Sequence, residues 1–247
     1  MRENLVVMKK ILLFVAMAAV CASCGPHKPS VAEQRAEKRQ KDSLSMVQYA
    51  RTVVYTDSLL QTVLPQADEL LKSFRYVKNE KYADHGYYIQ PVLETAGAGQ
   101  RIYLQAYVMD AVTGSTDGAP AYKTVVRSFY YGQKLNHKGL TVSADSVSNS
   151  FHGNLHAYDA EGQHEILTLT DADAVALLQF VSAYASAKIT VKLEGDRTYS
   201  YVLKDKDKAA LVETLRLQTL MSDIRQLEAQ HKQASLQYEK YARRLDK

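Results

Sequence analysis

The sequence predicts an α+β protein in which an antiparallel, mostly β domain is inserted between two long, coiled-coil-like helices. Near each end of the chain, apolar residues recur at alternating spacings of three and four, as on one face of a long helix. Between about residues 86 and 204 the period changes to two, the repeat of a half-buried strand. We therefore expect a helix over 31–80, a sandwich-like β domain with one packed helix over 86–204, and a second long helix over 205–247.

Residues 1–23 have the features of a signal peptide. Lys9 and Lys10 precede the apolar run 11–20, which ends in small residues. The run is about half as long as the ~20 apolar residues that a bilayer-spanning helix needs. We therefore expect this segment to be removed rather than to remain as a membrane span.

The only two cysteines, Cys21 and Cys24, lie at the end of this segment. A redox pair should open a helix in a strand–helix–strand pattern, and a structural zinc site needs further Cys or His ligands at close spacing. Neither context is present in the sequence. The stretch Ala-Ser-Cys-Gly over 22–25 instead resembles the lipobox of bacterial lipoproteins, although Cys21 stands where that family usually has Leu or another aliphatic residue.

The resemblance covers residues 1–25 and implies cleavage before Cys24, followed by lipidation of its sulfur and acylation of its amino group. Several acyl chains together make a stable membrane anchor. An ordinary secretory signal that leaves Cys24 free is the alternative. Gly25 is not the aspartate that the resemblance associates with retention in the inner membrane, so we expect an outer-membrane location facing the periplasm. Residues 24–30 contain two prolines and form the anchor and a short tether.

The first long helix carries an apolar seam with two flaws. Asp57 interrupts the seam, and Pro65 is expected to kink the helix or restart it. The seam residues are Met46, Ala50, Val53, Asp57, Leu60, Leu64, Ala67, Leu71 and Phe74.

The second long helix has a cleaner seam of about four heptads, and Asp205 is expected to cap its start. At a rise of 1.5 Å per residue, this helix would be roughly 60 Å long. Its seam residues are Leu217, Leu220, Ile224, Leu227, His231, Ala234, Tyr238, Tyr241 and Leu245.

The β domain is expected to contain seven strands. They lie over 101–109, 122–131, 140–146, 151–158, 165–169, 188–193 and 198–203, with a hairpin turn at 194–197. In the first of these strands, Ile102, Leu104, Ala106 and Val108 should face one way, and Tyr103, Gln105 and Tyr107 the other. A helix after Thr170, its expected cap, should bury Val175, Leu178 and Val181.

The two long helices need partners for their seams. An antiparallel hairpin within one chain is the more economical arrangement, and intermolecular coiled coils would use the same seams. The hairpin would bring the basic residues near both chain ends together, beside the membrane. Removal of residues 1–23 leaves 28 basic and 26 acidic residues, a balance that argues against a nucleic-acid binder.

Candidate reactive sites are few in this sequence. His152, His156 and His164 resemble a metal site only if their segment is helical, whereas its alternating pattern favours strands on which the rings diverge. Two carboxylate pairs, Asp171 with Asp173 and Asp205 with Asp207, open helices, and the helix dipole explains them. We expect no catalytic residues, no metal and no cofactor.

Tyrosine is abundant, with 17 residues and no tryptophan. If Tyr103, Tyr107 and Tyr130 form an exposed row, they could bind a protein or stack on sugars. The alternative is that they cover the second face of a half-exposed sheet. We expect a non-enzymatic interaction or scaffold protein of the cell envelope, which binds another envelope component through its β domain or helical stalk. A small-ligand or glycan-binding lipoprotein is the alternative.

Overall fold

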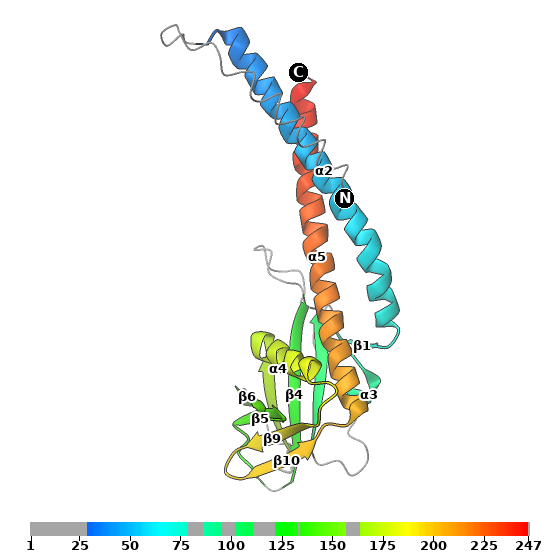
Figure 1. The fold of residues 1–247 in the computed structure, drawn as a ribbon, viewed down its shortest axis with the longest axis vertical. Coiled ribbons are helices and arrows are strands. Elements are labelled where there is room, and N and C mark those ends of the chain that lie inside the picture. Colours follow the sequence, from blue (N-terminus) through cyan, green and yellow to red (C-terminus); the bar gives the residue numbers. More distant parts are fainter. Residues whose placement is uncertain are drawn as a thin grey trace. The chain divides into compact units, whose positions relative to one another are not determined.

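The computed structural model describes residues 29–78, 86–94, 102–110, 122–132, 134–156 and 164–246 (Figure 1). The expected signal peptide, the expected lipidation site Cys24 and residues 25–28 of the tether lie outside these ranges. The fold is α+β, with two antiparallel sheets, a long N-terminal helix and a long C-terminal helix. Contacts divide the described chain into two compact units. One contains the residues up to Gln48 together with those from Tyr238 onward, and the other is Tyr49–Gln237.

All the strands belong to the second unit and form two sheets. The larger sheet has the order β1 (Arg75–Lys78), β2 (Gly86–Ile89), β3 (Ile102–Asp110), β4 (Tyr122–Tyr131), β8 (His164–Thr170) and β7 (Asn154–His156). The smaller sheet has the order β10 (Thr198–Val202), β9 (Ile189–Glu194), β5 (Gly139–Ala144) and β6 (Val147–His152). Every neighbouring pair is antiparallel.

Most expected strands form close to their predicted bounds, and the hairpin between β9 and β10 is confirmed. The prediction of one strand over 140–146 and another over 151–158 is wrong. The chain turns at Asp145 and Ser146, and β6 pairs with β5 from Val147 onward. Asp145, the first central residue of this turn, has φ 52°, and a positive φ at that position is common in two-residue hairpin turns.

One hydrophobic core joins both sheets to the short helix α4 (Asp171–Ala183) and to the first turns of α5 (Asp205–Leu245). On the apolar face expected for β3, Leu104, Ala106 and Val108 are buried and Ile102 is half-buried, while Tyr107 on the other face is buried as well. Side chains in this core come from β4 and β8 (Val126, Leu167, Leu169), from β5 and β9 (Leu140, Val142, Val191, Leu193), and from the helices (Leu177, Leu178, Val181, Leu211).

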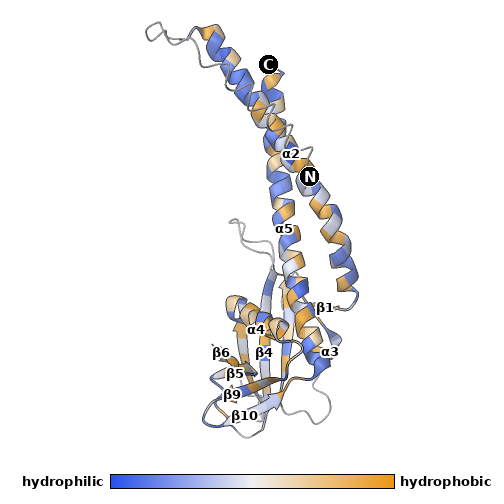
Figure 2. Cartoon of the chain, viewed as in Figure 1, coloured by the Kyte–Doolittle hydropathy of each residue, from blue (hydrophilic) through white to orange (hydrophobic). Residues whose placement is uncertain are grey.

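Helix α4 is more apolar than the two long helices (Figure 2). Thr170 occupies the N-cap position, but its side chain makes no capping hydrogen bond, so the expected cap is wrong in that respect. Asp171 instead begins the helix with φ 52°. The buried stripe differs from the prediction, because Val175 is only half-buried and three further residues are buried. Its buried members are Ala174, Leu177, Leu178, Phe180 and Val181.

Helix α2 (Val31–Leu71) begins with a reciprocal capping box. The Ser30 amide donates to the Glu33 carboxylate at 2.7 Å, and the Glu33 amide donates to the Ser30 hydroxyl at 3.2 Å. The helix runs uninterrupted through Pro65, which is exposed. The prediction that it extends to residue 80 is wrong, because the chain leaves the helix after Leu71 and forms β1 against β2. A single helical turn, α3 (Pro91–Glu94), follows β2.

The buried face of α2 differs from the predicted seam. Asp57 and Leu64 are exposed. The buried residues are Thr56, Ala67 and Leu70, of which only Ala67 belongs to the predicted seam. The Thr56 hydroxyl lies within hydrogen-bonding distance of two carbonyls of its own helix, so Thr56 can be buried where the Asp57 carboxylate cannot.

In α5 the predicted seam is closer to what is observed, with Leu217, Ile224 and Ala234 buried. The helix starts at Asp205 rather than being capped by it. Its first amides, of Asp207 and Lys208, donate to the Lys204 carbonyl.

Candidate functional site

Helices α2 and α5 contact each other at two places within the Tyr49–Gln237 unit. At one, Leu70 of α2 packs with Leu217 and Met221 of α5 and with Val108 of β3 in a small buried cluster. At the other, the Thr56 Oγ1 of α2 lies 3.1 Å from the His231 Nδ1 of α5. The two contacts fix the distance between α2 and α5 at both ends of an intervening segment of the helix pair.

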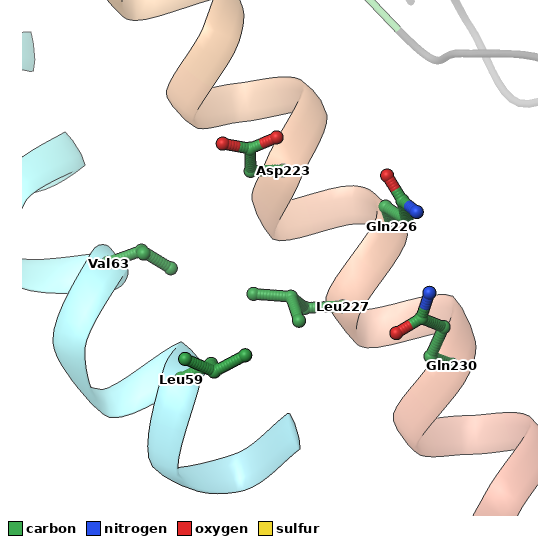
Figure 3. A pocket seen from close by; sticks show the side chains of 6 residues that line it. All are labelled: Leu59, Val63, Asp223, Gln226, Leu227 and Gln230. Carbon is green, nitrogen blue, oxygen red and sulfur yellow. The ribbon is translucent and has the colours of Figure 1, made fainter. Parts of the chain in front are cut away.

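Between these contacts the helices leave a groove of about 320 Å³, which we call the interhelical groove (Figure 3). Its lining residues are Leu59, Val63, Asp223, Gln226, Leu227 and Gln230. Leu227 extends from α5 toward Leu59 and Val63 of α2, whereas the amide and carboxylate groups lie along α5 (Figure 3). The groove thus combines three aliphatic side chains with hydrogen-bonding groups on one side.

The chemistry of this lining suits binding. Aliphatic side chains offer van der Waals contacts, and the two glutamines can donate to and accept from a peptide backbone. No histidine, cysteine or hydroxyl side chain is among the six lining residues. The groove therefore fits one or two apolar side chains of a partner, with polar atoms beside them.

The contact between Thr56 and His231 borders the groove, and the surroundings of the Thr56 hydroxyl indicate which of the two side chains donates the hydrogen bond. The Thr56 hydroxyl lies 2.9 Å from the Thr52 carbonyl and 3.0 Å from the Val53 carbonyl. A hydroxyl has one proton, and when a helix carbonyl accepts it, the oxygen is left to accept a hydrogen bond. A His231 ring protonated at Nδ1 supplies that bond and satisfies every atom in the contact.

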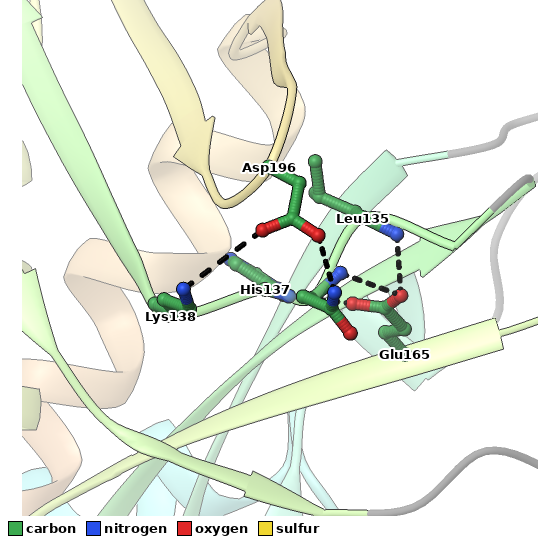
Figure 4. A network of polar contacts seen from close by, with 6 residues as sticks. Leu135, His137, Lys138, Glu165 and Asp196 are labelled. Carbon is green, nitrogen blue, oxygen red and sulfur yellow. Dashed lines mark hydrogen bonds and ion pairs between the residues drawn. The ribbon is translucent and has the colours of Figure 1, made fainter.

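A second polar constellation lies at the segment between β4 and β5, where the chain passes from the larger sheet to the smaller one (Figure 4). Glu165 of β8 is buried, and its carboxylate accepts hydrogen bonds from three successive backbone amides. The donors are Leu135 at 2.6 Å, Asn136 at 3.0 Å and His137 at 2.6 Å. We call this arrangement the Glu165 clasp.

The turn between β9 and β10 completes the clasp. The Asp196 amide donates to the Leu135 carbonyl at 2.8 Å, and the Asp196 carboxylate accepts from the Asn136 side chain. Gly195 has to be glycine, because an added Cβ would lie 2.3 Å from the Leu135 carbonyl oxygen. These contacts tie three strands to one connecting segment and account for the buried carboxylate without a ligand.

His137 is the most unusual member of the clasp. Its side chain is fully buried, and neither ring nitrogen has a hydrogen-bond partner that meets ordinary geometric limits. Burial lowers the pKa of His137 to about 4, and the Glu165 carboxylate and the Gly139 backbone oppose this shift. The ring is neutral at physiological pH and has no access to solvent, so we assign it no ligand.

The structure does not form the exposed tyrosine row that the sequence suggested. Tyr107 and Tyr130 are buried, and Tyr103 is half-buried against Phe129, with stacked ring centroids 4.6 Å apart. Tyr103 and Tyr107 lie on the second face of the larger sheet, which is the alternative that the sequence left open, and they pack against Phe129 and Tyr87 respectively. Tyr130, from the opposite face of its strand, packs against Tyr199 with a centroid separation of 4.8 Å.

The tyrosine pKa values reflect this packing. Burial raises the pKa of Tyr107, and Arg127, which lies over its ring at 5.2 Å, opposes the shift. Burial and the neighbouring Tyr199 hydroxyl raise the pKa of Tyr130 to about 12. These phenols stay neutral at physiological pH.

The three histidines of the metal-like stretch fall on three strands of two sheets. His152 is exposed on β6 of the smaller sheet, whereas His156 and His164 belong to β7 and β8 of the larger one. His156 lies opposite Ile166 in the register. Within the part of the chain that the structure describes, no three His, Cys, Asp or Glu residues are grouped so as to hold a metal ion.

The two carboxylate pairs lie in the first turns of α4 and α5, as expected. In the second pair, the Asp205 carboxylate lies 2.9 Å from the Lys208 ammonium group. This ion pair gives Asp205 a structural partner beside the helix dipole.

Comparison with known proteins gives no assignment. No protein-family model matches the chain, and neither a curated protein nor a solved structure matches it. Among the helices described here, none combines the length and the hydrophobicity that a membrane crossing requires.

Proposed function

We propose that this protein is a lipid-anchored, non-enzymatic interaction protein of the cell envelope, and that it binds another envelope protein through the interhelical groove. The observation that carries the proposal is the lining of the groove, in which Leu59, Val63 and Leu227 lie beside the amides of Gln226 and Gln230. A partner segment with one or two apolar side chains would bury these residues and pair with the amides.

The anchor is proposed at Cys24, on the lipobox-like stretch over 22–25. Together with Gly25, this stretch supports an outer-membrane lipoprotein that faces the periplasm. Incorporation of radiolabelled palmitate in cells tests the anchor directly. Label is expected in the parent chain and not in Cys24→Ala.

The stalk is proposed to be a coiled-coil-like hairpin formed within one chain rather than a homo-oligomer. The contact of Thr56 with His231 and the packing of Leu70 on Leu217 support this arrangement, because they join α2 to α5 of the same chain. The β domain is proposed to be sandwich-like. Its single core, which both sheets line together with α4, supports that description.

The test of the groove is photocrosslinking in living cells. A photoreactive residue is placed at position 63 or 227, inside the groove, or at position 229 as the matched control. Ala229 is exposed and lies two residues along α5 from Leu227, which puts it near the opposite face of the helix. We expect one dominant protein adduct from positions 63 and 227 and none from position 229.

Two further variants make the test specific. Val63→Asp adds a charge to the groove and should abolish the adduct formed from position 227, while the far-ultraviolet circular dichroism of the purified protein stays unchanged. Cys24→Ala should abolish the adduct by removing the proposed anchor. Adducts of equal yield from positions 227 and 229, or none from positions 63 and 227, would contradict the proposal.

A further inference from the structure

Basic side chains gather where the first turns of α2 meet the last turns of α5, within the unit formed by both ends of the described chain. Arg35, Lys38 and Arg39 of α2 and Arg244 of α5 line a hollow of about 790 Å³ together with Ala32, Ala36 and Asp42. Arg244 Nη1 lies 3.8 Å from Asp42 Oδ1, which joins the two helix ends. We call these four basic residues the basic surface.

Most of the positive charge on this surface is not neutralised by a neighbour. The nearby carboxylates are engaged elsewhere, since Glu37 pairs with Lys41 at 2.7 Å and Glu239 pairs with Arg243 at 3.4 Å. Among the residues that the structure describes, no ion pair involves Arg35, Lys38 or Arg39. All three are exposed. The surface therefore presents cations that are free to pair with an anionic partner.

The position of the basic surface along the chain identifies the kind of partner. The capping box of Ser30 and Glu33 fixes where α2 begins. Ser30 lies six positions after Cys24, and an extended chain of that length spans at most about 20 Å. Arg35, Lys38 and Arg39 follow in the next turns of the helix. If Cys24 carries the lipid, these cations are held close to a phospholipid surface.

We propose that the basic surface binds an anionic phospholipid membrane, an inference that builds on the lipid anchor of the proposed function. Arginine donates paired hydrogen bonds to phosphate oxygens, and lysine adds a point charge. Each basic residue near an anionic bilayer strengthens binding by roughly fivefold. Loss of three such residues should therefore weaken binding on the order of 100-fold.

The test uses residues 24–247 with Cys24→Ser, so that neither signal peptide nor lipid contributes. This chain keeps every contact described above, because all of them are made among residues 29–246. Its binding is measured by cosedimentation with equimolar phosphatidylcholine–phosphatidylglycerol vesicles and with pure phosphatidylcholine vesicles. We expect binding to the anionic vesicles only, and we expect it to weaken as the salt concentration rises.

The decisive comparison is between two triple variants of equal charge. Arg35→Gln, Lys38→Gln and Arg39→Gln together should reduce binding by the predicted factor. The control replaces Lys123, Lys188 and Lys206, which are exposed residues of the other unit, with glutamine and should leave binding unchanged. Equal loss in both triple variants, binding to neutral vesicles, or displacement by inorganic phosphate at constant ionic strength would overturn the proposal. Because the assay contains no lipidated protein, its failure is distinct from failure of palmitate labelling.

Discussion

Glu165 lies in a site where a carboxylate accepts stronger hydrogen bonds than a neutral side chain would. Its two oxygens accept bonds from three backbone amides in a buried site, at 2.6 to 3.0 Å. Hydrogen bonds to a charged acceptor are roughly twice as strong as neutral ones, and the low local dielectric strengthens them further. The amides of a sharply turning segment, with Asn136 at φ 52°, are thereby satisfied without a regular ladder.

His137, beside this carboxylate, should make the protein sensitive to acid. Its pKa is about 4 in the folded chain and about 6.5 when exposed, so below pH 6.5 the unfolded chain binds the proton first. Unfolding therefore becomes easier as the pH falls from about 6.5 to about 4. This residue should account for a loss of about 3 kcal/mol in the free energy of unfolding over that range.

His137→Leu removes this contribution, so the free energy of unfolding of the variant should fall less steeply as the pH is lowered. The free energy of unfolding is measured by urea titration at pH 7.5 and at pH 4.5 for the parent and the variant. We expect the drop between the two pH values to be smaller in the variant by about 2.5 kcal/mol. If both proteins lose the same stability, His137 is not the group that responds to acid.

The sequence could not reveal either residue. Glu165 begins a predicted strand and would ordinarily point to solvent, and its donors lie 28 to 30 positions away. His137 lies in a connecting segment without periodicity. The exposure of the tyrosines stayed open in the sequence for a related reason, because the alternation in β3 shows which residues share a face but not whether other aromatic side chains cover that face.

At the scale of elements, Lys208 joins α5 to the segment that follows α4. Its side chain is 7% exposed, and its ammonium group donates to the Ala185 carbonyl at 2.7 Å and to the Ala187 carbonyl at 2.9 Å. Asp205 supplies the third partner at 2.9 Å. All three donors of the lysine are thus used, which is what makes its burial tolerable.

Lys208→Met keeps the aliphatic stem but removes the donor from both carbonyls. We expect a loss of about 1–3 kcal/mol in the free energy of unfolding, because two charge-assisted hydrogen bonds at a part-buried site are lost. Denaturant titration at neutral pH measures the loss. The matched control is Lys206→Met, an exposed residue in the same turn of the helix, which should change stability by less than about 0.5 kcal/mol. Equal effects of the two substitutions would refute this role of Lys208.

Periodicity predicted the elements well where one face is buried and poorly elsewhere. The seam of α5 was found because apolar residues fill it. The strand β6 was missed because the residues Ser148, Asn149 and Ser150 are all exposed and polar, and the turn before it uses Asp-Ser instead of the stronger Asp-Gly signal. In α2 the prediction is correct at Ala67 but one residue out at Asp57, because the buried residue there is the polar Thr56, which an apolar pattern does not find.

At the scale of the whole molecule, the order of the parts was predictable because the hydrophobic period changes twice along the chain. The groove was not predictable from the sequence, because it depends on the distance between the two helices and not on which residues face inward. Both proposals depend on one feature, the pairing of α2 with α5 of the same chain. That pairing creates the groove in one unit and the basic surface in the other.

Chemical crosslinking of positions 56 and 231 tests this pairing most directly. Residues 24–247 with Cys24→Ser contain no cysteine, so Thr56→Cys and His231→Cys add a single reactive pair. After treatment with a short bismaleimide, denaturing electrophoresis and mass spectrometry should find the two residues joined within one monomeric chain, because their side chains are in contact. Crosslinked dimers as the main product would show that the helices pair between chains, and would contradict the account.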